Sequence, residues 1–237
     1  MKFAGASCVA AFVAAASVAK ADYVSTTLLD LVGTADIAAA GEIVEVHQDT
    51  FVLKVDETLI GEKHETIEIQ QFRDWACASR WAPYKVGQKV LVFLEEKDGE
   101  FTLPGAGGES ESPIEGKFVY CQFPYPADPL DLERYGAHHA PKLRLHDLMG
   151  AIREYRSCFR VTPAKDPWRR VGEHKEYFAF DRIEQVCSTL ALRKYTTHSA
   201  VHTYLVESTR RERERLKPAA HPEQLPRARY AWPAPRR

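Results

Sequence analysis

Residues 41–55 read GEIVEVHQDTFVLKV, and this stretch decides the fold class. Its first part, residues 41–46, predicts a strand. After a short connection at residues 47–50, apolar residues alternate with charged ones, which is the period of a half-buried strand: Phe51, Leu53 and Val55 against Lys54 and Asp56. The stretch therefore predicts two neighbouring strands of an antiparallel sheet.

Strand patterns continue downstream. Residues 67–69 alternate, and residues 89–94 form an unbroken apolar run that is typical of a strand buried on both faces. The Asp-Gly pair at residues 98–99 predicts a hairpin. A Gly-rich and Ser-rich flexible loop over residues 104–113 is expected before a last strand at residues 118–121. Five or six short strands predict a small antiparallel OB-like β-barrel, residues 22–125.

Beyond the barrel, apolar residues recur at helical spacing, which predicts a helical C-terminal extension over residues 126–208. Residues 144–159 form one amphipathic segment. A second segment covers residues 181–190, with Asp181 as its N-cap, and a third begins near Ser199.

The first 21 residues match a secretory signal peptide: Lys2, an uncharged run over residues 3–19, and an Ala-x-Ala cleavage site that ends at Ala21. The alternative is a short membrane anchor. Cleavage predicts a secreted or periplasmic protein that begins at Asp22. Directly after it, Ser25 is predicted to cap a short helix.

Export changes how the cysteines of the mature chain are interpreted. An oxidising compartment favours disulfides among Cys77, Cys121, Cys158 and Cys187, and four cysteines allow three pairings. We expect one bridge within each half of the chain, Cys77 with Cys121 and Cys158 with Cys187. The alternative is four buried free thiols.

Charge is distributed unevenly along the chain. Residues 22–208 carry a net charge of −9, whereas residues 209–237 carry nine Lys or Arg and three Asp or Glu, a net charge of +6. Residues 209–237 are also rich in Pro and Ala and are predicted to be a disordered basic tail. An anionic component of the cell envelope is a candidate partner for this tail, whereas export argues against nucleic acid. The alternative is a solvated charge run.

Aromatic and cationic residues gather around Cys77 in the long connection between two barrel strands. Arginine and tryptophan are enriched at binding hot spots, and OB barrels often bind through loops. We therefore take four residues as candidate binding residues: Arg73, Trp75, Arg80 and Trp81. The alternative is that the tryptophans close the barrel end.

His198 and His202 are four residues apart, a spacing that places two imidazoles on one helix face. A metal site would need a further ligand, for which His174 and Glu207 are the candidates. Solvated or capping histidines are the alternative. Because the mature chain lacks the common nucleophile, metalloprotease and nucleotide-binding motifs, we expect no catalytic residues and no cofactor.

The order of these segments resembles that of a known family: residues 33–37, 41–46, 51–55 and 59–62, then Cys77 and residues 84–93. This order, over about residues 28–121, resembles the tissue inhibitors of metalloproteinases and the netrin-like modules of exported bacterial proteins. The resemblance implies a five-stranded OB-type barrel. In the animal inhibitors an N-terminal cysteine chelates the protease zinc, whereas the mature start here is Asp22. The resemblance therefore does not imply protease inhibition.

These patterns favour an exported non-catalytic module that binds a protein or a carbohydrate through its barrel loops. Two alternatives remain open: a periplasmic metal-dependent enzyme that uses the histidine cluster, and a structural cell-envelope protein.

Overall fold

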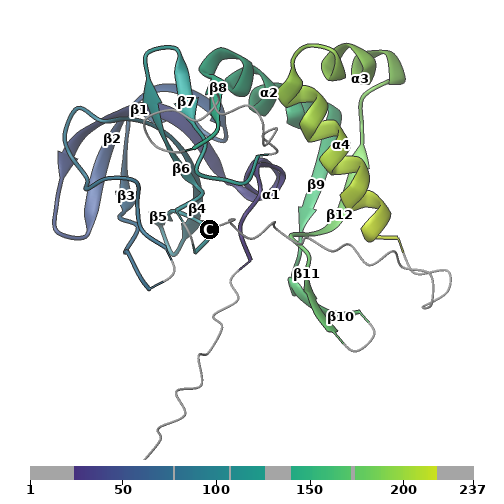
Figure 1. The fold of residues 1–237 in the computed structure, drawn as a ribbon, viewed down its shortest axis with the longest axis horizontal. Helices are drawn as coiled ribbons and strands as arrows, with labels where there is room; N and C mark the ends of the chain where they lie inside the picture. The colour runs from purple at the N-terminus through teal and green to yellow at the C-terminus, as the bar shows by residue number, and fades with distance from the viewer. Residues whose placement is uncertain (1–23, 77, 107, 126–139, 172–173, 218–237) are drawn as a thin grey trace, which may run out of the picture.

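The computed structural model describes residues 24–76, 78–106, 108–125, 140–171 and 174–217 (Figure 1). In Figure 1 the strands of a barrel lie on the left, and the helices α3 (Thr189–Thr196) and α4 (Ala200–Arg215) lie on the right. Helix α2 (Leu145–Cys158) lies between them at the top. The predicted signal peptide, Cys77, residues 126–139 and the end of the basic tail lie outside the described residues.

Five strands close into a barrel. Each pairs with two neighbours, in the order β1-β2-β3-β5-β4 with β4 returning to β1, and every pair is antiparallel except β3 with β5. The structure therefore confirms the expectation of a small, mostly antiparallel β-barrel. The strands are β1 (Ile37–Val46), β2 (Thr50–Ile60), β3 (Thr66–Gln70), β4 (Lys89–Lys97) and β5 (Glu100–Thr102).

Alternation along the strands separates two hydrophobic clusters. In β4, Val90, Val92 and Leu94 face the barrel interior. The residues between them, Leu91 and Phe93, belong to a second cluster, which also contains residues of α1 (Leu28–Thr34), α2 and α4. All five are buried, so β4 is buried on both faces, as its unbroken apolar run predicts.

Glycine allows β1 and β2 to come close together at one irregular position of their register. A Cβ atom on Gly41 would lie 2.1 Å from the carbonyl oxygen of Lys54. No other residue fits there without moving the backbone of β2.

Three more strands extend the sheet beyond β4, in the order β6 (Glu111–Glu115), β7 (Phe118–Tyr120) and β8 (Lys142–Arg144). The prediction of a flexible loop over residues 104–113 is wrong at its end, because residues 111–113 pair with residues 90–92 of β4. Glu111 and Ser112 are buried there. Their polarity concealed the strand.

The C-terminal part contains helices, as expected of the helical extension, but also strands that the spacing did not predict. Its helices are α2 (Leu145–Cys158), α3 (Thr189–Thr196) and α4 (Ala200–Arg215). Two small sheets pair β9 (Phe159–Pro163) with β12 (Phe180–Gln185) and β10 (Trp168–Val171) with β11 (His174–Tyr177). In Figure 1 the β10–β11 hairpin projects from the body of the molecule.

Two helix starts differ from the predicted ones. Asp181 lies in β12 and caps no helix; Ser188 caps α3 by accepting a hydrogen bond from the backbone N–H of Ala191. Helix α1 (Leu28–Thr34) begins after Thr27 and not after Ser25, because Thr27 and Asp30 form a capping box.

The start of the predicted disordered tail, at residue 209, is wrong. Residues 209–215 belong to helix α4, in which Thr209 and Glu212 are buried. Among the described helices, none is long and apolar enough to cross a membrane.

One disulfide links the described elements of the C-terminal part. Cys158 at the end of α2 is bonded to Cys187, with 4.5 Å between their Cα atoms. Among the described residues, Cys121 is a free thiol that lies buried in the cluster between barrel and helices. Cys77, the partner expected for Cys121, lies outside the described residues.

Candidate metal centre

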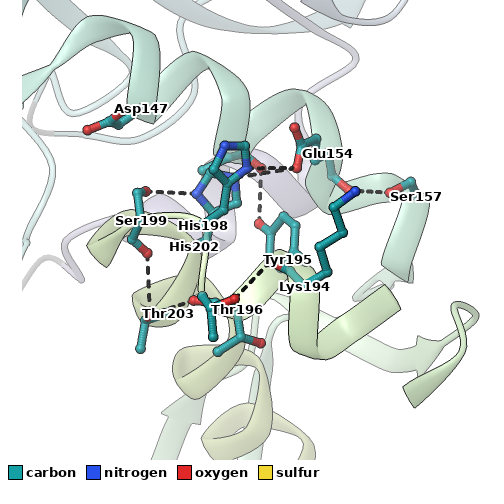
Figure 2. A network of polar contacts seen from close by, with 12 residues as sticks. Asp147, Glu154, Ser157, Lys194, Tyr195, Thr196, His198, Ser199, His202 and Thr203 are labelled. Carbon is teal, nitrogen blue, oxygen red and sulfur yellow. Dashed lines mark hydrogen bonds and ion pairs between the residues drawn. The ribbon is translucent and has the colours of Figure 1, made fainter. Parts of the chain in front are cut away.

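Three potential metal ligands come together where α2, α3 and α4 meet (Figure 2). Glu154 projects from α2, His198 lies in the turn between α3 and α4, and His202 lies in the first turn of α4. One ligand atom from each residue lies within 4.8 Å of the other two.

His202 is the best-defined member of this cluster. Its side chain is 1 % exposed, and its ring packs edge-on against Tyr195 with 4.6 Å between ring centroids. Its Nδ1 atom is 2.8 Å from the hydroxyl oxygen of Ser199, which fixes the ring orientation. The buried Nε2 atom has no hydrogen-bond partner among the described residues, and it lies 3.6 Å from Oε2 of Glu154. A buried polar atom without a hydrogen bond is costly unless something binds it.

His198 completes the cluster from the solvent side. Its Nδ1 atom is 3.5 Å from the same Oε2 atom of Glu154, and its ring centroid is 4.7 Å from that of His202. Both His198 and Glu154 are exposed for about half of their side-chain surface. The cluster is therefore buried on the His202 side and open to solvent on the other.

The electrostatics favour a neutral His202. Burial lowers its pKa below the usual value, and the Glu154 carboxylate opposes this shift only in part. A simple ion pair with Glu154 needs a protonated His202, which burial disfavours. A metal ion needs the neutral imidazole, so the same burial suits metal binding.

The distances are close to those of a zinc site. Tetrahedral coordination with bonds of about 2.0–2.1 Å places neighbouring ligand atoms about 3.3 Å apart. The two nitrogen-to-Oε2 distances are 3.5 and 3.6 Å. Small side-chain rotations of the exposed His198 and Glu154 would bring the three atoms onto one ion, with one coordination position left open.

The sequence spacing found two of the three candidate ligands. The structure places His198 and His202 together, as a metal pair requires. The third candidate ligand is Glu154, whereas Glu207 forms an ion pair with Arg211, and His174 lies on β11 with its side chain outside the described residues. No local pattern connects Glu154 with histidines more than forty residues later.

The candidate binding residues of the barrel connection are divided between interior and surface. The Arg80 guanidinium is buried between the rings of Trp81 and Tyr84, at 4.1 and 3.8 Å from their centroids, and pairs with Glu111. Trp81 packs against the cluster inside the barrel. These contacts agree with the alternative that this part of the connection closes the barrel.

The other two residues of this set lie at the surface. Arg73 is largely exposed and pairs with Asp49. Trp75 is 39 % exposed, and its indole N–H donates to the carbonyl oxygen of Ala106. Arg73 and Trp75 therefore remain accessible to a ligand.

Comparison with known proteins gives no relative: no protein-family model, no curated protein and no solved structure matches this chain.

Proposed function

We propose that this protein is an exported module that binds a divalent transition-metal ion through Glu154, His198 and His202. The observation that carries the proposal is the Nε2 atom of His202, which is buried, has no hydrogen-bond partner in the described part of the chain, and lies close to the other two candidate ligands. Two imidazoles and one carboxylate suit zinc better than magnesium or calcium, which prefer oxygen ligands.

We also propose that the protein is exported and that its barrel is of the OB type. The Cys158–Cys187 disulfide is compatible with an oxidising compartment. The strand order, with β3 parallel to β5, supports an OB-type barrel, and hence the resemblance to tissue inhibitors of metalloproteinases and netrin-like modules.

Zinc titration of the metal-free mature chain by calorimetry tests the metal site. We expect one zinc ion per chain, and a loss of affinity of at least about tenfold for each of Glu154→Gln, His198→Ala and His202→Ala. His146→Ala is the matched control, because His146 lies on α2 but is highly exposed and outside the cluster. Unchanged zinc binding in the triple variant would refute the proposal.

The open coordination position also permits a metal-dependent enzyme, because catalytic zinc sites combine three protein ligands with a bound water. Ester hydrolysis that requires zinc and is lost in Glu154→Gln would favour the enzyme. Zinc binding without hydrolysis would leave the binding role.

A second candidate function is protein or carbohydrate binding through the barrel loops, favoured by the accessible Arg73 and Trp75. Trp75 fluorescence can be followed against a panel of envelope glycans, in a background in which the other tryptophans are replaced by Phe. A spectral shift that Arg73→Ala weakens would support this role. If no glycan shifts the Trp75 emission, carbohydrate binding is excluded for the panel, and a protein ligand is the form of this role that is left.

A further inference from the structure

A surface groove runs between β12 and the last two turns of α4. Its volume is about 390 Å³. Three successive residues of β12 line one side, namely residues 181–183. Because successive residues of a strand point to opposite faces, a groove that touches three in a row follows the edge of the strand.

One edge of β12 is unpaired within the described part of the chain. There, β12 pairs with β9 alone, in a two-stranded sheet. An unpaired strand edge presents backbone N–H and C=O groups to which an extended peptide can add as a further strand.

The groove is cationic. Arg182, Arg210, Arg213 and Lys217 line it, together with two acidic residues. Both acidic residues are already engaged, Asp181 with Arg169 and Glu214 with Lys217. Within the described ranges, Arg210 and Arg213 form no ion pair, so they are available to carboxylates of a ligand.

We propose that an acidic segment of a partner protein adds as a strand to β12 in this groove, with its carboxylates at Arg210 and Arg213. The apolar side chains of Ile183 and Leu216, which also line the groove, give a peptide side chain a partly apolar floor. A strand edge and an apolar floor favour a peptide over an acidic polysaccharide. This site is separate from the proposed metal centre and does not depend on it.

Fluorescence anisotropy with the mature chain and a labelled peptide of about six residues, alternating Glu and Val, tests the proposal. We expect binding that weakens with salt, and no binding of the corresponding Lys-Val peptide. Arg213→Glu should weaken binding at least about tenfold. Arg211→Glu is the matched control. This substitution makes the same charge change on α4, but Arg211 does not line the groove.

Amide hydrogen exchange separates strand addition from simple charge attraction. Bound Glu-Val peptide should slow exchange in residues 181–185, and a peptide with Pro in place of Val should bind at least about tenfold more weakly, because Pro cannot donate to the ladder. Three results would each overturn the proposal: no binding of the Glu-Val peptide, equal binding of the Pro peptide, or binding of polygalacturonate alone.

Discussion

Arg80 and Glu111 form an ion pair beneath the 71–88 connection, with 2.5 Å between Nη2 and Oε1 and only 5 % and 2 % of their side chains exposed. The hydroxyl of Tyr84 donates to the same carboxylate, and the side-chain oxygen of Gln88 accepts from Arg80. Arg80 therefore links the 71–88 connection to β6 through its ion pair with Glu111.

Removal of Arg80 should destabilise the fold strongly. Arg80→Ala leaves the Glu111 carboxylate buried without its cation, and such a loss costs about 3 to 5 kcal/mol of unfolding free energy. Urea denaturation of the mature chain measures it. Arg73→Ala, which removes an exposed ion pair, should change stability by less than about 1 kcal/mol. Equal effects of the two substitutions would contradict this assignment.

Ser199 should act as a positioning residue for the metal site. Its hydroxyl fixes the His202 ring through Nδ1, so Ser199→Ala should weaken zinc affinity by about 10-fold to 100-fold with unchanged stoichiometry. The side chain makes no helix-capping hydrogen bond, so little stability should be lost. Thr197→Ala, whose hydroxyl bonds only to nearby carbonyl groups, is the control and should bind zinc normally.

The Cys158–Cys187 bridge should stabilise the mature protein. Its cysteines are 29 residues apart, and a loop of that length corresponds to about 3 to 4 kcal/mol in the chain-entropy account. The double Ser variant should lose about this amount in urea denaturation, and its stability should not respond to reductant. Non-reducing peptide mapping that links either cysteine to another partner would contradict the structure.

Cys121 should be unreactive while the protein is folded. Burial raises the pKa of its thiol far above the usual value, and the thiolate is the form that reacts. In a Cys77→Ser background, iodoacetamide should label Cys121 rapidly in urea and very slowly without it. Rapid labelling of the native protein would show that Cys121 is accessible.

Glu212 should make stability depend on pH. Burial raises the pKa of its carboxyl above the usual 4.5, and Arg215 opposes this only in part. The folded state therefore binds this proton more tightly than the unfolded state, and the resulting stability is lost as pH rises through the raised pKa. The free energy of unfolding of the natural protein, minus that of Glu212→Gln, should fall as the pH rises above the usual pKa of 4.5. If the free energies of unfolding of the natural protein and of Glu212→Gln change with pH in parallel, Glu212 does not cause the pH dependence.

Local patterns were sufficient where an element is defined by its own residues. The alternation over residues 51–55 and the apolar run over residues 89–94 predicted barrel strands, because side-chain period and burial are local properties. The spacing over residues 144–159 predicted α2 for the same reason.

Local patterns failed where a distant partner decides the conformation. Ile183 and Leu190 have helical spacing, yet residues 180–185 form a strand because they pair with β9, and the helix begins only after Ser188. The strand at residues 111–115 was missed for a related reason. Its buried Glu111 is tolerated only because Arg80, 31 residues earlier, supplies the opposite charge.

The sequence by itself determined the barrel strands, the helical spacing of α2 and α4, and the closeness of His198 to His202. Only the tertiary structure decided that Glu154 lies beside the two histidines, that Arg80 is internal, and that β12 and two exposed arginines of α4 line one groove. The reason is physical. Period and propensity act over a few neighbouring residues, whereas a ligand set or a buried ion pair depends on which distant segments the packing of the core brings together.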